Sequence, residues 1–165
     1  METLTQRLAA LPNQHRVALE WFAQHAGTEV PWPAPLEHGT LLATRAKGIY
    51  KPSWTQYALS VRQTLSGPYA DRDPVFRTDG TWSFSYYQEN PDPSARDTEY
   101  ANRGLMACLR DKVPVGVMRQ ISGKPQVRYH ILGVALVAGC EAGTGRRPRH
   151  NSLSPSAMSN LLTSL

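Results

Sequence analysis

Residues 113–138 read VPVGVMRQISGKPQVRYHILGVALVA, and this stretch decides the fold. Val113, Val115 and Val117 recur at every second position, which is the period of a β-strand with one apolar face. From Ile131 onward apolar residues occupy both parities, which indicates a strand buried on both sides. The Ser-Gly-Lys-Pro between the two runs is typical of a hairpin turn. The sequence therefore predicts two strands joined by a turn, 113–120 and 126–138.

Three further strands are expected upstream, over residues 40–45, 56–62 and 81–88. The last of these alternates cleanly, so that Trp82, Phe84 and Tyr86 share one face, which we expect to be directed to the core. Tyr87 then points to the other face. The residues between the first two strands, 47–54, are predicted to form a loop rich in groups that bind phosphates or stack on bases.

Helical spacing indicates two N-terminal segments, 4–11 and 13–26, and a short helix over 101–110. Three prolines within 30–35 predict a stiff connector, because proline removes a backbone donor and keeps its neighbours extended. We expect an α+β fold, a curved, barrel-like β-sheet with flanking helices. The expected divisions are an N-terminal helical segment with its connector, a main domain and a flexible tail: 1–35, 36–139 and 140–165.

Positive charge is concentrated in the middle of this 165-residue chain. Residues 39–138 hold 13 basic and 8 acidic side chains, and the formal net charge of the whole chain is +5. No Asp or Glu occurs between Glu37 and Asp71. Basic and aromatic side chains alternate there, a pattern that suits a polyanion with stackable bases, although it also fits an ordinary solvated basic face. They are Arg45, Lys47, Tyr50, Lys51, Trp54, Tyr57 and Arg62.

Several classes of protein are disfavoured. No apolar run approaches the ~20 residues that span a bilayer, and the first residues lack a signal-peptide pattern, so we expect a cytoplasmic, nucleoid-associated protein. The two cysteines form no disulfide or metal framework. Nuclease, serine-hydrolase and nucleotide-binding motifs are absent, so we expect neither enzymatic activity nor a cofactor or metal.

Aromatic and acidic side chains lie close together between residues 66 and 88. A base turned out of a duplex is held by stacking on its faces and by hydrogen bonds to its edge, and a carboxylate accepts from the exocyclic amino group of cytosine. The residues with this chemistry are Tyr69, Asp71, Asp73, Tyr86 and Tyr87. The alternative is that the aspartates form a turn after Pro68 and that Tyr86 belongs to the core.

Residues 40–139 resemble the SRA-like modified-cytosine readers of the PUA superfamily, in the version fused to HNH nucleases in modification-dependent restriction enzymes. The order of the matching pieces is that of the family. These pieces are Arg45-Ala-Lys-Gly-Ile-Tyr-Lys-Pro52, Tyr57-Ala-Leu-Ser-Val-Arg62, Gly67-Pro-Tyr-Ala-Asp71, Asp79-Gly-Thr-Trp-Ser-Phe-Ser-Tyr86, Asn102-Arg-Gly-Leu105, Pro114-Val-Gly-Val117 and Tyr129-His-Ile-Leu-Gly-Val-Ala135.

The resemblance implies an SRA/PUA-type fold and a pocket for a flipped 5-methylcytosine in double-stranded DNA. Tyr69 and Tyr86 would stack on the base and Asp71 would read its edge. The acidic run here is Ala70-Asp71-Arg72-Asp73, so either aspartate could be the reader. The flanking phosphates would be bound by Arg45, Lys47, Tyr50, Lys51, Arg62 and Arg103.

The fused nuclease of the family is absent from this sequence, so we expect a DNA-binding protein rather than an enzyme. Two alternatives stay open. The chain could be the recognition part of a bacterial modification-dependent restriction system whose nuclease is missing or supplied by a partner. It could also be a PUA-like module that binds RNA.

Overall fold

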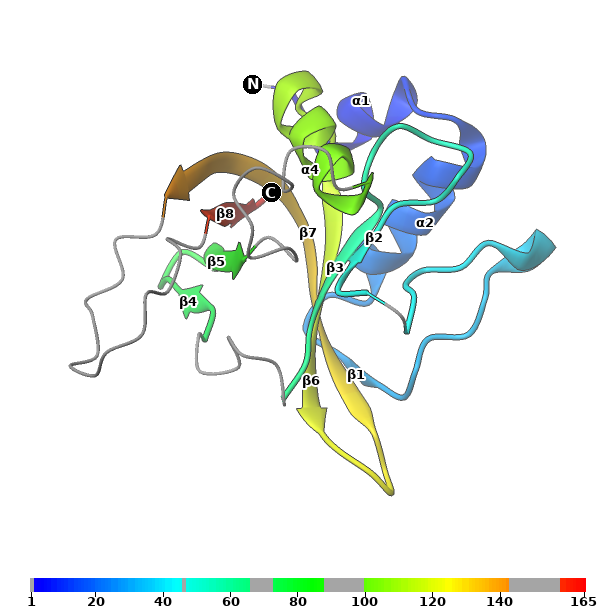
Figure 1. The fold of residues 1–165 in the computed structure, drawn as a ribbon, viewed down its shortest axis with the longest axis vertical. Coiled ribbons are helices and arrows are strands. Elements are labelled where there is room, and N and C mark those ends of the chain that lie inside the picture. Colours follow the sequence, from blue (N-terminus) through cyan, green and yellow to red (C-terminus); the bar gives the residue numbers. More distant parts are fainter. Residues whose placement is uncertain (1, 46, 66–72, 88–99, 143–157) are drawn as a thin grey trace.

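The computed structural model describes residues 2–45, 47–65, 73–87, 100–142 and 158–165. Within these ranges no helix combines the length and the apolar character that crossing a membrane requires. Figure 1 shows helices gathered around a sheet whose long strand bends. The elements are α1 (Leu4–Ala9), α2 (Asn13–Gln24), β1 (Glu29–Val30), a 3-10 turn η1 (Glu37–Gly39), β2 (Ile49–Tyr50), β3 (Ser60–Gln63), β4 (Val75–Phe76), β5 (Trp82–Tyr87), α4 (Tyr100–Asp111), β6 (Val115–Ser122), β7 (Arg128–Ala142) and β8 (Met158–Ser164).

The strands form one mixed sheet in the order β2-β3-β6-β7-β8-β5-β4, with β1 added at the side of β7. The β3–β6 pair is parallel, and the other pairs are antiparallel. The expected α+β class is confirmed. Strands β2 and β4 are the two ends of the path and do not pair within the described residues, so the sheet is open and curved rather than closed into a barrel.

Both faces of strand β6 are buried, each under a different helix. Val115 and Val117 belong to the apolar cluster that includes α4, as the alternation of valines predicts. On the other face a Cβ at Gly116 would lie 2.3 Å from the ring of Phe22, so this glycine makes room for helix α2. Met118 follows on the same face in the α2 cluster. The alternation of side chains along one strand therefore connects two separate cores.

Strand β7 is buried on both sides, as its apolar residues at both parities predict. Ile131 and Val134 face the α2 cluster, whereas Leu132 and Ala135 face the α4 cluster. The register against β6 shifts at this point, and Gly133 has φ +122°, a conformation that side chains other than hydrogen rarely adopt. The bulge exchanges the two parities midway along the strand and explains the unbroken apolar run.

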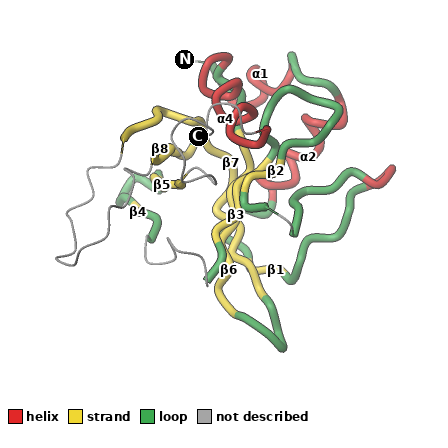
Figure 2. Tube along the Cα trace, viewed as in Figure 1, coloured by secondary structure: helices red, strands yellow, loops and turns green. Residues whose placement is uncertain are grey.

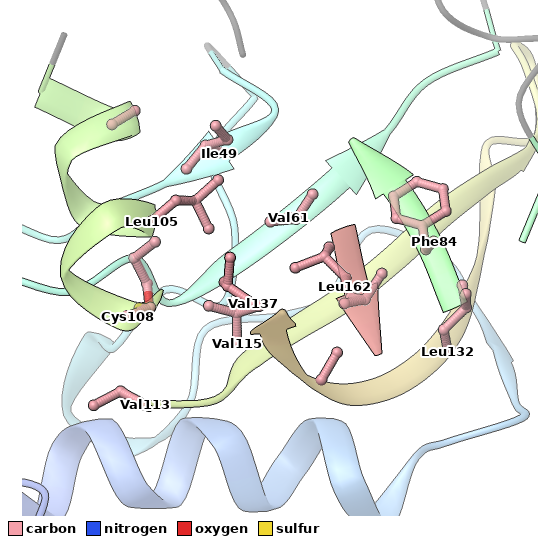
Figure 3. Packing of buried hydrophobic residues seen from close by; sticks show 14 of the residues in the cluster. Ile49, Val61, Phe84, Leu105, Cys108, Val113, Val115, Leu132, Val137 and Leu162 are labelled. Carbon is pink, nitrogen blue, oxygen red and sulfur yellow. The ribbon is translucent and has the colours of Figure 1, made fainter. Parts of the chain in front are cut away.

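The C-terminal strand β8 corrects the expectation of a flexible tail for residues 158–164. It pairs with β7 on one side and with β5 on the other. In Figure 2 strands β4, β5 and β8 lie on the opposite side of β7 from α2. Leu162 is fully buried between Phe84 and Val137, and Figure 3 shows it in the same cluster as Leu105 of α4. Three apolar residues in a polar tail gave little indication of a central strand.

The predicted strand over 40–45 is wrong. Leu42 is buried against α2, but its carbonyl accepts a hydrogen bond from Ser60 Oγ at 2.7 Å instead of pairing in the sheet. Strand β3 is already paired with β2 and β6, so neither side of β3 is left for residues 40–45 to pair with. The pairing strand is instead β2, within the stretch expected to be a loop.

The N-terminal helices are part of the core rather than a separate segment. Leu19 and Phe22 of α2 are fully buried against the sheet, and β1 pairs with β7. His15 is also fully buried, with its ring centroid 5.8 Å from that of Trp54, and neither of its ring nitrogens has a hydrogen-bond partner in the described structure. This burial lowers the pKa of His15 from 6.5 to about 4.

Replacing Leu162 by Ala should lower the free energy of unfolding by about 2–5 kcal/mol, because the substitution leaves a cavity where β8 joins two strands. Chemical denaturation followed by circular dichroism measures this change. Leu165→Ala is the matched control, because Leu165 is 49% exposed and its truncation should change stability by less than about 0.5 kcal/mol. Equal effects of the two substitutions would contradict the assignment of β8 to the core.

Stability should depend on pH through His15. The folded protein keeps this imidazole neutral down to pH about 4, whereas the unfolded chain binds the proton below pH 6.5. The free energy of unfolding should therefore fall by up to about 3 kcal/mol as the pH drops from 6.5 to 4. In His15→Leu this part of the pH dependence should disappear.

The control for this pH dependence is His38→Asn. His38 is exposed at φ 63°, which asparagine tolerates, so the variant should keep the wild-type pH profile. An unchanged slope in His15→Leu would contradict the assignment.

Candidate nucleic-acid interface

Arg62 organises the basic loop of residues 44–48. It is 8% exposed, and its Nη2 donates to the carbonyl oxygens of Thr44 at 3.2 Å, Arg45 at 3.3 Å and Lys47 at 3.4 Å. Its backbone N–H donates to the Gly48 carbonyl at 2.7 Å. Although predicted to contact phosphate, Arg62 is thus a buried support whose charge is balanced by carbonyl dipoles.

Trp32 of the proline-rich connector supports the same loop. The Arg45 guanidinium lies 4.4 Å from the centroid of the Trp32 ring, and that of Arg62 lies 5.5 Å from it. The indole packs against the Tyr129 ring in a T-shaped arrangement, with 5.5 Å between ring centroids. Arg45 is exposed on its other side. The ring face thus holds a cation at the surface without neutralising it.

Tyr86 meets the basic loop at Gly48. A Cβ at Gly48 would lie 1.8 Å from Tyr86 Oη and 3.0 Å from the Arg62 carbonyl oxygen, so the tyrosine hydroxyl rests directly on the glycine backbone. On β5, Trp82 and Phe84 are buried and Tyr86 is half-buried against the same cluster, which confirms that these three residues share a face. This face therefore runs from the core to the loop that carries Arg45 and Lys47.

Lys51 fastens a second loop to helix α4. Its Nζ donates to the carbonyl oxygens of Thr55 at 2.5 Å and Pro52 at 3.3 Å, and it lies 3.9 Å from the centroid of the Tyr100 ring. Tyr100 Oη donates to the Pro52 carbonyl at 3.1 Å. A Cβ at Gly104 would lie 3.0 Å from Lys51 Cδ, so the lysine stem lies along α4. These contacts hold the loop from Lys51 to Thr55 in place.

The other predicted backbone-binding residues differ in exposure. Lys47 and Arg103 are exposed, whereas Tyr50 is half-buried in β2. Burial raises the pKa of Tyr50, with a smaller contribution from Tyr100, so its hydroxyl stays protonated and can donate a hydrogen bond at neutral pH.

The predicted base-pocket residues are described only in part. Tyr69 and Asp71 lie outside the described residues. Tyr87 is placed by its backbone, which pairs with Ser159 of β8. Asp73 is described, and its carboxylate forms an ion pair with Arg119 of β6. The structure therefore brings Tyr86 to Gly48, in the loop that also carries Arg45 and Lys47, and it places Asp73 at β6.

Two residues that contact predicted site residues, Arg119 and Trp32, were not predicted from the sequence. Arg119 binds both Asp73 and Gln63, and Trp32 lies under Arg45 and Arg62. A charged residue that continues the valine face of 113–117 is the signal that could have singled out Arg119. Trp32 stood among prolines, where no periodicity could assign it a face. Among the described residues, no three His, Cys, Asp or Glu side chains converge on a possible metal position.

No protein-family model matches this chain, and no curated protein matches it in sequence. Solved structures do show similarity. KRYPTONITE in complex with mCHH DNA, an H3(1-15) peptide and SAH has a TM-score of 0.45 and 18% identity over 66% of this chain, which spans 23% of that chain. The SUVH5 SRA complex with fully methylated CG DNA has a TM-score of 0.45 and 18% identity, covering 72% of this chain and 73% of that chain.

A second SUVH5 SRA structure, with methylated CHH DNA, has a TM-score of 0.43 and 22% identity over 66% of this chain and 64% of that chain. The TM-scores of these similarities are low, and the function proposed below rests on the residues of this chain.

Replacing Gly48 by Ala should displace the Tyr86 ring, because the added methyl group collides with its hydroxyl. Overpacking of this kind should lower the free energy of unfolding by about 1–3 kcal/mol. The ring resonances of Tyr86 in NMR spectra should shift at the same time. Gly123→Ala is the control, because nothing lies within 4 Å of a Cβ at that position. Unchanged Tyr86 resonances in Gly48→Ala would contradict the contact.

Proposed function

We propose that this chain binds double-stranded DNA that contains modified cytosine, 5-methylcytosine in the first place, and holds the modified base turned out of the duplex. Tyr86 forms one wall of the base pocket, Tyr69 stacks on the base, and Asp71 accepts a hydrogen bond from its amino group. The observation that carries the proposal is the contact of the Tyr86 hydroxyl with the Gly48 backbone.

This contact joins an aromatic ring to a loop that carries two exposed cations. A flipped nucleotide presents a base and its phosphates together, so its site needs a stacking surface and positive charge within one nucleotide of each other. Tyr86 provides the ring, and the loop that rests on it provides Arg45 and Lys47.

The exposure of the predicted backbone-binding residues separates those that contact phosphate directly from those that act indirectly. Arg45, Lys47 and Arg103 are exposed and bind phosphate oxygens directly, with Tyr50 as a further donor. Arg62 acts indirectly, because its Nη2 holds the loop that carries Arg45 and Lys47. Lys51 also acts indirectly, because its Nζ already binds carbonyl oxygens of its own loop. The chain has no acidic side chain from residue 38 to residue 70, so nothing within that stretch repels the polyanion.

The choice of double-stranded DNA with a modified base as the ligand follows from the resemblance of the sequence to SRA-like readers, whose motifs occur in the same order. The sequence supplies no nuclease motif, so in a restriction setting the nuclease would be missing or supplied by a partner. An RNA-binding role would use the same cations and rings on a single strand. These rivals differ in the ligand they prefer and in whether the DNA is cut.

The purified chain should bind a duplex with one 5-methylcytosine more tightly than the same duplex with cytosine. Fluorescence anisotropy titrations compare duplexes containing cytosine, 5-methylcytosine and 5-hydroxymethylcytosine with single-stranded RNA of the same sequence. Equal affinity for the three duplexes would refute the proposal, and tighter binding of RNA would favour the RNA-binding module. Cutting of the duplex after addition of Mg²⁺ or Mn²⁺ would show that the chain is itself a nuclease.

Two substitutions separate the roles within this assay. Lys47→Ala should weaken binding to all duplexes alike and reduce the slope of log K against log salt by about one. Asp71→Ala should remove the preference for the modified duplex. Lys124→Ala is the matched control, an exposed lysine in the β6–β7 turn that should leave affinity and slope unchanged. A loss of preference in Lys47→Ala would contradict this division of roles.

A further inference from the structure

Two guanidinium groups share the ring of Trp32. That of Arg45 lies 4.4 Å from the ring centroid, and that of Arg62 lies 5.5 Å from it. In the part of the chain that the structure describes, neither group forms an ion pair with a carboxylate. Two like charges beside one ring repel each other, and an anion bound next to them would relieve this repulsion. The two arginines therefore indicate a position where an anion can bind.

Only one of the two arginines has donors available for an anion at the surface. Arg62 is 8% exposed, and its Nη2 donates to carbonyl oxygens of the loop. Arg45 is exposed, and its guanidinium donates no hydrogen bond to any residue that the structure describes. A guanidinium that lies on an aromatic ring contacts the ring through its face, whereas its N–H donors lie along its edge. The edge of Arg45 is therefore open to an oxygen acceptor.

The Trp32 ring has a fixed position against strand β7. Val30 of β1 is the register partner of Tyr129, and two residues later the Trp32 ring packs on the buried Tyr129 ring. Pro31 and Pro33 lie on either side of Trp32, where they restrict the backbone, and Pro33 is buried. The ring on which Arg45 lies is therefore placed by the sheet rather than by the basic loop.

We propose that Trp32 is a positioning residue for phosphate binding, because its ring holds the Arg45 guanidinium with its edge free for a phosphate of the DNA. The inference rests on the proposed function, which makes the bound anion a DNA phosphate. An arginine side chain loses rotamer freedom when it binds a phosphate, and one that already lies on a ring loses less. The proline-rich connector is then part of the DNA-binding surface.

The sign of the effect of Trp32 on affinity tests this arrangement. If Arg45 had to leave the ring to reach a phosphate, Trp32 would compete with the DNA, and removing the indole would tighten binding. If Arg45 binds phosphate while it lies on the ring, removing the indole weakens binding. The strength of a cation–π contact at the surface corresponds to a change of about 2- to 5-fold in affinity.

The experiment measures affinity for 5-methylcytosine and cytosine duplexes, at several salt concentrations, for Trp32→Leu, Trp32→Phe, Arg45→Ala and the combination of Trp32→Leu with Arg45→Ala. Trp32→Leu should weaken binding of both duplexes by about 2- to 5-fold. Trp32→Phe should recover part of this loss, because a phenyl ring also offers a face to a cation. Arg45→Ala should reduce the slope of log K against log salt by about one, and adding Trp32→Leu to it should cause no further loss.

Trp21→Leu is the matched control, because Trp21 is also half-buried but its ring stacks on His25, with 4.1 Å between ring centroids. It should leave DNA affinity unchanged. Unchanged or tighter binding in Trp32→Leu would overturn the inference. A further loss of about 2- to 5-fold when Trp32→Leu is added to Arg45→Ala would show that Trp32 acts through the fold, and would overturn it as well.

NMR spectra locate Arg45 without relying on affinity. The Nε–H resonance of Arg45 should carry a ring-current shift in the free wild-type chain, lose it in Trp32→Leu and keep it in Trp21→Leu. It should also keep this shift when a duplex is added. Loss of the shift on binding would show that Arg45 leaves the ring and would contradict the proposed role of Trp32.

The proposed function and this inference fail in different ways. Equal affinity of the wild-type chain for all duplexes would refute the recognition of modified cytosine. Phosphate contacts carry no sequence information, so the comparison of Trp32→Leu with and without Arg45→Ala would still decide the role of Trp32 on any of these duplexes. Absence of binding to every nucleic acid would refute both.

Discussion

The pairing of β8 with β5 and β7 is the interaction on which the rest of the structure depends. Within the described residues, β5 reaches the main sheet through β8, so the last strand of the chain determines where Tyr86 lies. Leu162 of β8 and Phe84 of β5 lie in the same apolar cluster as the buried side chains of α4, so their packing fixes β5 against the core. Strand β8 must therefore be in place before Tyr86 of β5 can contact Gly48 in the basic loop.

The two faces of the sheet differ in how completely they are buried. On one face α2 packs into the space left by Gly116, and this face is closed by apolar contacts. On the other face the cluster under α4 extends along β5 until Tyr86, which is only half-buried. The buried core and the proposed base site thus share strand β5, and burial decreases between Phe84 and Tyr86.

The sequence was most informative where periodicity alone determines burial. The β6–β7 hairpin, α4 and the shared face of β5 followed from spacing, since a buried strand or helix face repeats regularly. β8 was missed because its partner β5 lies far away in sequence and its own apolar residues are few. The segment over 40–45 was misassigned because propensity cannot show that β3 already has two partners. The alternation of side chains along β5 could not show whether Tyr86 belongs to the core or to the candidate site, because the core residues and Tyr86 share one face of the strand.

The arginines of this chain show two ways of using the same guanidinium. Arg62 is buried and its Nη2 donates to carbonyl oxygens, whereas the Arg45 guanidinium lies on an indole ring, so neither of these contacts uses a carboxylate. Arg119 instead binds a carboxylate and a buried amide, which cancels its charge and gives it a fixed geometry. A cation paired with a carboxylate attracts phosphate weakly, so of these three arginines the exposed Arg45 has the arrangement that the proposed phosphate contact requires.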